Sequence, residues 1–264
     1  MTNATYLVDS PAAGLLLGLI EMRRLFPDPG EVDPIDAYGR LSRDGHRPRV
    51  RLNMIATVDG AGSLDGHSAA LGGPADKALF ATLRALADVI LVGAATMRTE
   101  TYGPARLDDT NRGLRLNWAM TAVPPIAVVT RACRLDWQSP FFADAEQRPI
   151  IITAASAALD DRTRAAEVAD VIMAGDDGVD LAQALRALAE RGHENVLAEG
   201  GPGIAAQLAG ADLLDELCLT VSPLLAGGDA KRILDGGLLR PPARFELRHV
   251  LESDGYLFLR YRRR

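Results

Sequence analysis

A single carboxylate stands beside a glycine hinge in the segment VLAEGGPGIAAQLAG, which spans residues 196–210. Three apolar residues precede Glu199, and two glycines, a proline and a third glycine follow it. This order predicts a buried strand that ends near Glu199 and a helix that begins near Pro202. Because ligands bind at the carboxyl ends of the strands in α/β sheets, Glu199 is a candidate for acid–base chemistry or ligand binding.

A second hinge of the same layout lies in VILVGAATMR, residues 89–98, where an apolar run meets Gly93 just before a helix start. Helix N-termini offer unpaired N–H groups and partial positive charge, so both hinges favour phosphate groups. One hinge can serve packing alone, whereas two in one sheet suit a dinucleotide. Residues 201–206 also read G-x-G-x-x-A, but the next strand-like run, 217–221, lacks the ribose-binding acid of a Rossmann fold.

Four further side chains could do chemistry, although the sequence also allows a simpler interpretation of them. Thr130 and Arg131 follow a strand-like run and could bind a 2′-phosphate, although an arginine after a strand is common on surfaces. Asp59 could transfer a proton, but Val-Asp-Gly is also a good turn signal. Arg84 could bind a phosphate or lie on a solvated helix face.

Composition argues against several other classes of protein. The net charge is −6 with acids and bases interspersed, so we expect no nucleic-acid partner. Cys133 and Cys218 stand alone and the four histidines show no ligand spacing, which predicts neither a disulfide nor a metal site. The apolar run 12–20 is too short to span a bilayer, so we expect a soluble cytoplasmic protein without a membrane partner.

The elements that must position these residues alternate along the chain. Strand-like runs occupy residues 125–130, 149–153, 170–175 and 195–200, and helix-like runs occupy residues 74–86, 156–166, 180–190 and 202–209. The continuous Val/Ile runs predict strands buried on both faces, and hence a largely parallel sheet between helix layers. Residues 245–250 and 256–261 alternate around a turn signal and predict an antiparallel end.

The N-terminal residues 1–47 differ in character from the rest of the chain. We expect an amphipathic helix that ends near Arg24, followed by an irregular linker rich in proline and acids at FPDPGEVDPIDAY. The compact domain then extends over residues 48–264.

Three segments resemble one known family and occur in its order: NMIATVDGAGSLDGHSAALGG, LRALADVILVGAATMRTETYGP and VLAEGGPGIAAQLAGADLLDELCLTVSPLLAGG. They are similar to the reductase domain of the bifunctional riboflavin-biosynthesis deaminase/reductase, over roughly residues 48–264. The resemblance implies a dihydrofolate-reductase-like, three-layer α/β/α fold, whose mixed sheet is mostly parallel with antiparallel C-terminal strands. It also implies a homodimer that uses NADPH to reduce the ribosyl group of a phosphorylated aminopyrimidine to ribityl, as a 5-amino-6-(5-phosphoribosylamino)uracil reductase does.

The resemblance carries site residues over position by position. It assigns Ser68, Arg84, Arg106 and Glu199 to substrate binding, with Glu199 and Asp59 as the candidates for proton transfer. It assigns Ala56, Thr57, Gly93, Ala95, Thr96, Glu100, Gly200, Gly201, Pro202, Gly203 and Ile204 to the cofactor, to which Thr130 and Arg131 are added by residue type. The glycines of the second hinge would then serve the cofactor, and Glu199 would point toward the substrate.

The chain also departs from the family in three ways. It lacks H-x-E and P-C-x-x-C, so it holds only the reductase half, and the family's D-D-P-x-L-T-x-R lip becomes ETYGPAR at residues 100–106. The 47 N-terminal residues have no counterpart. The rewritten lip permits a dihydrofolate or other pteridine reductase. A non-catalytic NADP-binding protein is a third reading, which replacement of Asp59 and Glu199 would have favoured.

Overall fold

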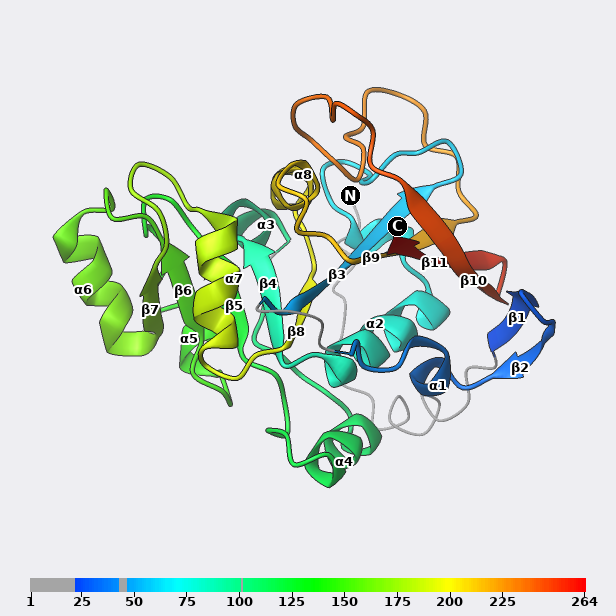
Figure 1. Cartoon of the computed structure of the whole chain (residues 1–264), viewed down its shortest axis with the longest axis horizontal. Helices are drawn as coiled ribbons and strands as arrows, with labels where there is room; N and C mark the ends of the chain where they lie inside the picture. The colour runs from blue at the N-terminus through cyan, green and yellow to red at the C-terminus, as the bar shows by residue number, and fades with distance from the viewer. Residues whose placement is uncertain (1–21, 43–46, 101) are drawn as a thin grey trace, which may run out of the picture.

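The computed structural model describes residues 22–42, 47–100 and 102–264, and one sheet runs through all of this part (Figure 1). Its strands are β1 (Met22–Phe26), β2 (Gly30–Val32), β3 (Arg49–Thr57), β4 (Val89–Gly93), β5 (Ile126–Val129), β6 (Ile150–Thr153), β7 (Asp170–Met173), β8 (Asn195–Ala198), β9 (Glu216–Ser222), β10 (Phe245–Ser253) and β11 (Tyr256–Arg263). The order across the 11-stranded sheet is β2-β1-β10-β11-β9-β3-β8-β4-β5-β6-β7.

The sheet changes from parallel to antiparallel at β9. Across the sheet, from β9 through β3, β8, β4, β5 and β6 to β7, each strand is parallel to the next. Strand β11 then pairs antiparallel with both β9 and β10. The mixed sheet with antiparallel C-terminal strands confirms the fold class expected from the sequence.

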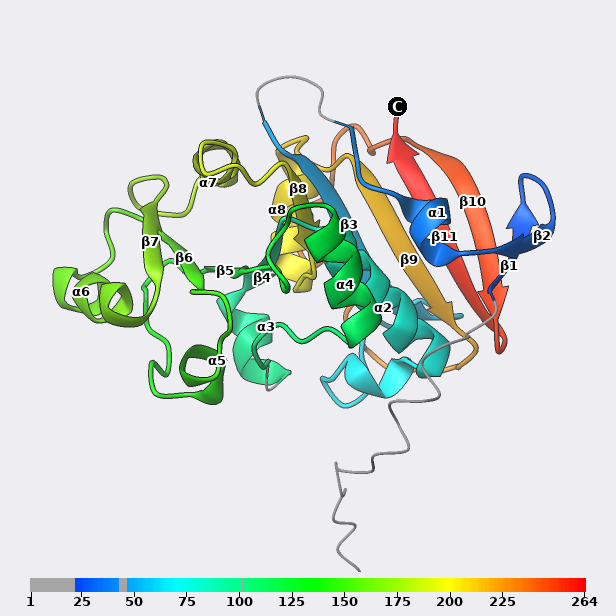
Figure 2. The same ribbon diagram turned by 90° about the horizontal axis from the view of Figure 1, so that it is seen from below.

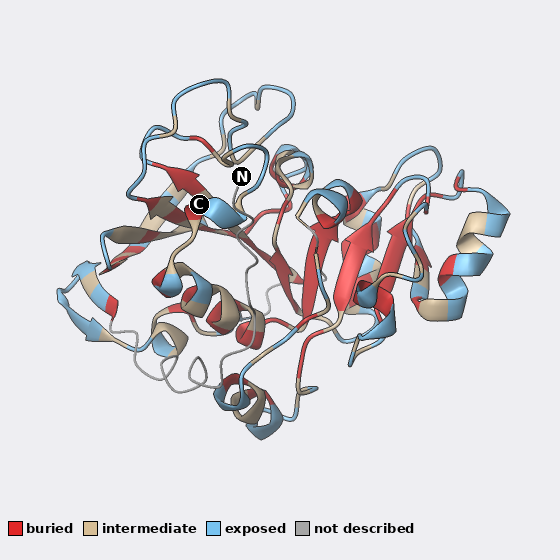
Figure 3. Ribbon diagram, turned by 180° about the vertical axis from the view of Figure 1, so that it is seen from behind, coloured by how far each residue is buried: buried red, intermediate tan, exposed pale blue. Residues whose placement is uncertain are grey.

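Helices cover both faces of the sheet. They are α1 (Pro34–Tyr38), α2 (Pro74–Leu86), α3 (Ala94–Thr99), α4 (Asp109–Asn117), α5 (Pro140–Ala143), α6 (Leu159–Val168), α7 (Leu181–Ala189) and α8 (Pro202–Gly210), with a 3₁₀ turn, η1, at Ala69–Leu71. Apolar side chains of α7 and α8 pack on one face of the parallel strands, while α2, α3, α5 and α6 pack on the other. Buried residues therefore concentrate in the parallel strands at the centre of the molecule (Figure 3). No described helix is long and apolar enough to cross a membrane.

The described part of the N-terminal segment differs from the sequence prediction. Residues 1–21 lie outside the described residues, but Met22–Phe26 is a strand and not the end of a helix. Strand β1 pairs with β2 and with β10, so the expected linker contributes a hairpin to the sheet (Figure 2). Strand β1 also covers the free edge of β10 and pairs its backbone groups, so the C-terminal strands leave no open edge at β10.

A buried ionic cluster, formed by Arg51, Glu216 and Arg260, fixes α1 on the sheet. Both arginines bind Glu216, Arg51 at 2.9 Å and Arg260 at 2.6 Å, and the Glu216 side chain is 2% exposed. The guanidinium of Arg51 also donates to the carbonyl of Tyr38 at 3.0 Å, and that of Arg260 donates to the carbonyl of Ala37 at 2.7 Å. These bonds satisfy carbonyl groups at the end of α1, where a helix has no internal donors for them.

Candidate active site

A cavity of about 740 Å³ opens beside the carboxyl ends of β4 and β8. Residues of β3, α2, α3 and the loops around them form its wall. Of the residues predicted for the site, it is lined by Ser68, Arg84, Ala95, Thr96, Glu100, Glu199, Gly201 and Pro202. The others do not line it: Ala56, Thr57, Asp59, Gly93, Arg106, Thr130, Arg131, Gly200, Gly203 and Ile204.

The two glycine hinges are joined to each other at this edge. The N–H of Gly93 donates to the carbonyl of Gly200 at 3.0 Å, which ties the end of β4 to the end of β8. A Cβ on Gly93 would lie 2.9 Å from Ile204 Cγ1, and one on Gly201 would collide with the hydroxyl of Thr96. The glycines are thus needed because the hinges approach so closely.

The helix that follows the second hinge begins with free donors. Helix α8 starts at Pro202, and its N-cap residue, Gly201, provides no side-chain cap. Amide groups at such a helix start can bind phosphate oxygens. Thr96 adds a hydroxyl on the same wall of the cavity. This set of backbone donors and small residues fits the pyrophosphate of a dinucleotide cofactor.

Glu199 lies in the cavity wall, where two partners hold its carboxylate. Its Oε1 accepts from Arg84 Nε at 2.8 Å, and its Oε2 accepts from Arg84 Nη2 at 2.8 Å. The hydroxyl of Tyr102 also donates to Oε2. The Glu199 side chain is 2% exposed and that of Arg84 is 13% exposed, so the pair is well shielded from water.

The electrostatics of this cluster follow from its burial. Burial alone would lower the pKa of Arg84, but the Glu199 carboxylate outweighs it and raises that pKa. Burial and the nearby carboxylate also raise the pKa of Tyr102 well above its ordinary value. The Arg84 guanidinium stacks on the ring of Phe80, 4.3 Å from its centroid. A phosphate would therefore have to compete with Glu199 for Arg84.

Ser68 and Glu100 contact each other on the wall of the cavity. The backbone N–H of Ser68 donates to Glu100 Oε1 at 2.9 Å. Both residues line the cavity. This bond connects the loop that carries η1 to the end of α3, so Glu100 shapes the wall.

Asp59 lies at an exposed turn after β3, outside the cavity wall. The Thr57 hydroxyl donates to its carboxylate, and so do the backbone N–H groups of Gly227 at 2.7 Å and Ala226 at 3.2 Å. These bonds, that of Thr57 foremost, lower the pKa of Asp59 to about 2. Through its hydrogen bonds to Ala226 and Gly227, Asp59 holds the loop that follows β9.

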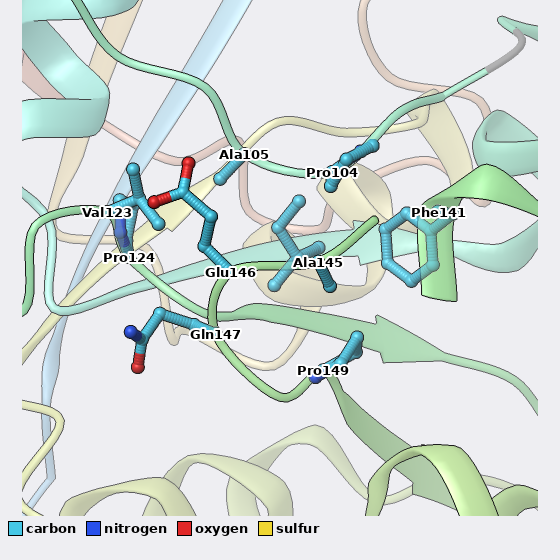
Figure 4. A pocket seen from close by; sticks show the side chains of 10 residues that line it. Pro104, Ala105, Val123, Pro124, Phe141, Ala145, Glu146, Gln147 and Pro149 are labelled. Carbon is cyan, nitrogen blue, oxygen red and sulfur yellow. The ribbon is translucent and has the colours of Figure 1, made fainter. Parts of the chain in front are cut away.

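Arg106 pairs with Glu146, which lines a different and much smaller hollow (Figure 4). It binds Glu146 at 3.2 Å, and Glu146 also binds Arg112 at 2.9 Å. The hollow, lined in part by Pro104 and Ala105, has a volume of about 10 Å³, which is room for about one water molecule. It is too small for a substrate.

Thr130 and Arg131 follow β5, one strand further from the cavity than β4. Thr130 is buried and its backbone N–H donates to the carbonyl of Ile152 at 2.9 Å. The Arg131 side chain is exposed and has no ion pair within the described part of the chain. Arg131 is therefore open to a ligand that extends from the hinges along the edge of the sheet, whereas the buried Thr130 is not.

Sequence reasoning missed several residues of the cavity wall. Asp76 and Phe80 were not predicted; they precede the predicted Arg84 at intervals of four along α2, and all three line the cavity, so they form one stripe of that helix. The chain contains only two lysines, Lys77 and Lys231, and both line the cavity. The helical spacing and the rarity of lysine were signals that the sequence alone contained. Among the described residues, no group of histidines, cysteines and acids could hold a metal ion.

The mixed sheet, the paired hinges and the cavity at the carboxyl ends of the strands define a reductase domain of the dihydrofolate-reductase-like class. Residues 48–258 match the family of the RibD C-terminal domain, and the chain belongs to that family. Membership of this reductase family implies a nicotinamide cofactor.

Relatives of the chain carry a consistent name. A protein of Archaeoglobus fulgidus named 2,5-diamino-6-ribosylamino-4(3H)-pyrimidinone 5′-phosphate reductase is 27% identical over 206 residues, which are 76% of this chain and 92% of the relative. The protein of that name from Methanothermobacter thermautotrophicus is 29% identical, over 72% of this chain and 85% of the relative. Among solved structures, a pyrimidine reductase-like protein of Corynebacterium diphtheriae has a TM-score of 0.75 and 26% identity, over 88% of this chain and 98% of its own.

Proposed function

We propose that this chain reduces the ribosyl group of a phosphorylated ribosylaminopyrimidine to a ribityl group in riboflavin biosynthesis, with NADPH as the reductant. The observation that carries the proposal is the single cavity that joins two cofactor-type hinges to the buried Arg84–Glu199 pair. The names of the relatives support the class of substrate. We propose that the protein is located in the cytoplasm, where biosynthetic reductases of small molecules act.

The residues of the hinges would hold the cofactor. The hydroxyl of Thr96 would bind the pyrophosphate from the cavity wall, and the N–H groups in the first turn of α8, which follow Gly201 and Pro202 of that wall, would bind it from the helix start. When bound, the cofactor supplies a hydride for C1′ of the sugar. The protein contributes mainly the position of the two reactants.

The opposite wall would hold the substrate. The ring of Phe80 offers an apolar face for a pyrimidine, while the oxygens of Glu199 can accept hydrogen bonds from ribose hydroxyls. Opening of the ribose ring requires a proton at the ring oxygen, which the hydroxyl of Tyr102 would supply, since it is the proton-bearing oxygen of this cluster and donates to Glu199. Asp59 would act indirectly, by holding the loop after β9 near the cavity.

Lys231 offers a cation for the 5′-phosphate of the substrate. It lies on the wall of the cavity and forms an exposed ion pair with Asp235 at 2.5 Å. The backbone N–H of Asp235 donates to the carbonyl of Pro202 at 3.1 Å, so this loop is anchored at the start of α8. The ammonium group of lysine is a compact charge on a flexible side chain, so it can follow and bind the 5′-phosphate of the substrate.

Turnover by the purified chain tests the proposal. The substrates to compare are 2,5-diamino-6-ribosylamino-4(3H)-pyrimidinone 5′-phosphate, its deaminated uracil counterpart, dihydrofolate and a dihydropterin, each with NADPH. We expect oxidation of NADPH with a ribosylaminopyrimidine. Turnover of dihydrofolate or the pterin alone would favour the pteridine reductase, and NADPH binding with no turnover of any substrate would favour a non-catalytic protein.

Arg131→Ala is expected to weaken NADPH binding by about ten- to a hundredfold and to change NADH binding little. The reason is the loss of one charge-assisted contact to the 2′-phosphate, which is worth about 1.5–3 kcal/mol. Titration of both cofactors by fluorescence measures the effect. Arg134→Ala is a matched control, because Arg134 is 77% exposed and pairs with Asp161. An equal loss for NADPH and NADH would remove Arg131 from the cofactor site.

We also propose that the chain forms a homodimer. Leu224, Leu225 and Leu238 are large apolar residues that the fold leaves exposed on the long connection between β9 and β10. Burial of such residues against a second copy would remove them from water. Light scattering at micromolar concentration should show twice the mass of the chain, and a monomer there would refute the proposal.

A further inference from the structure

The wall of the cavity holds a carboxylate that the proposed reaction has not used. Asp76 lies in the first turn of α2, one turn from Phe80 and two turns from Arg84 on the same stripe. The stripe is asymmetric in charge. At one end Arg84 is neutralised by Glu199, whereas at the other end no cation within the described residues lies within 4.0 Å of Asp76.

The surroundings of Asp76 leave it short of donors. The side chain of Thr220 on β9 gives it a hydrogen bond, yet burial has the larger effect and raises the pKa of Asp76. Gly72 makes room for this carboxylate, since a Cβ there would lie 2.5 Å from Asp76 Oδ2. A partly buried carboxylate is costly unless its oxygens receive hydrogen bonds. The oxygens of Asp76 can therefore accept hydrogen bonds from a ligand in the cavity, and such bonds would offset the cost of burying the carboxylate.

A first-turn acid can also stabilise its own helix, and this is the alternative to a ligand role. No side chain caps the start of α2, whose N-cap residue is Gly73. The contact of Asp76 with Gly72 keeps its carboxylate near the start of α2, but the same carboxylate bonds to Thr220 and Asp76 lines the cavity, so a ligand there can reach it.

We propose, on the basis of the function proposed above, that Asp76 selects the substrate by accepting two hydrogen bonds from the 2-amino group and the N3–H of a 2-aminopyrimidin-4-one ring. The name of the relatives' substrate places an amino group on C2 and a hydrogen on N3. These two donors are parallel and adjacent, so they match the two oxygens of one carboxylate, as a guanidinium does.

The order of groups along the stripe agrees with this pose. In the substrate, N3 lies across the ring from C6, which carries the ribosylamino group. With the 2-amino edge at Asp76, the ring lies along Phe80 and the sugar points to Glu199 and the hinges. The 5′-phosphate then lies beyond the sugar, toward the loop that carries Lys231.

The deaminated ring would fit poorly in the same place. It has a carbonyl oxygen on C2, which would face a carboxylate oxygen and leave it without a donor. Sites built around such hydrogen bonds reject the wrong partner strongly, by about a hundredfold or more. The chain would therefore act on the pyrimidine before its 2-amino group is removed, and a deaminase would have to act on its product.

The test compares two substrates and two carboxamide variants. We expect the wild-type chain to prefer the 2-amino substrate over the uracil by about a hundredfold or more in kcat/KM. Asp76→Asn should lose most of this preference, because its amide presents one acceptor and one donor, which suit N3–H and a C2 carbonyl. Turnover of the uracil by this variant should rise or stay constant. Asp109→Asn is the matched control, since Asp109 is an exposed first-turn acid of α4.

Several outcomes would overturn the inference. Equal losses for both substrates in Asp76→Asn would make Asp76 a structural residue, and an unchanged ratio would remove it from recognition. NADPH affinity and thermal unfolding of the variant, measured beside activity, show whether the cavity is intact. If the wild-type chain reduces neither pyrimidine, the proposed function itself fails. If it reduces them without discrimination, only the inference about Asp76 fails.

Discussion

Replacing Glu199 by glutamine is expected to lower turnover by about a hundredfold or more and the free energy of unfolding by about 3–5 kcal/mol. The variant keeps the shape of the side chain but removes the charge that faces Arg84. Because the pair is buried, Arg84 would then be a buried cation without its anion. Steady-state kinetics and urea unfolding measure the two effects. NADPH affinity should change little, since the backbone of the hinge is retained.

A second variant separates stability from chemistry at this position. Arg84→Met combined with Glu199→Gln removes both charges and should recover much of the lost stability, because no buried ion is left unpaired. Turnover should stay low, since the carboxylate of Glu199 is still missing. Full recovery of turnover in the double variant would show that Glu199 only balances Arg84. Normal turnover in Glu199→Gln alone would make Glu199 a structural residue.

Glu216→Gln is expected to lower the free energy of unfolding by a similar amount, about 3–5 kcal/mol, through a different cluster. Glu216 faces Arg51 and Arg260, and its loss of charge would leave two guanidinium groups uncompensated beneath α1. Urea unfolding measures the change. Glu252→Gln is the control, because its partner Arg23 is 65% exposed and such surface pairs are worth about 0–1 kcal/mol. Equal effects of the two variants would contradict the account of this cluster.

The parallel half of the fold could be predicted because its strands and helices have strong local patterns. Strands β4, β5, β6 and β8 are buried at every position, which the continuous apolar runs of the sequence indicated. Helix α8 begins at Pro202, as the hinge predicted, and α7 begins one residue after its N-cap, Asp180. In these elements, the local preference and the tertiary environment agree.

The N-terminal hairpin could not be predicted in the same way. Strand β1 reads MRRLF, in which two arginines interrupt the apolar pattern, and β2 has only three residues. Both strands form because β10 offers them an edge, and β10 lies more than 200 residues further along the chain. An edge strand takes its stability from its partner, so its own sequence carries a weak signal.

The candidate site shows the same division between local and long-range information. The end of β8 placed Glu199 at the edge of the sheet, which a strand followed by two glycines predicted. Its pairing with Arg84 joins residues 115 positions apart and depends on how α2 packs over β8. The role of Tyr102 depends on the path of the lip after α3, where the chain departs from its family. Asp76 escaped notice because a first-turn acid is ordinary in a helix.

The central claim is that the cavity brings the reduced nicotinamide next to C1′ of a phosphorylated ribosylaminopyrimidine. Transfer of deuterium tests it most directly. NADPH that carries deuterium at C4 of the nicotinamide, in each of the two stereoisomers, is mixed with the purified chain and 2,5-diamino-6-ribosylamino-4(3H)-pyrimidinone 5′-phosphate. The account predicts a ribityl product with one deuterium at C1′, from one of the two stereoisomers only. A product without deuterium at C1′, or oxidation of NADPH without a ribityl product, would contradict it.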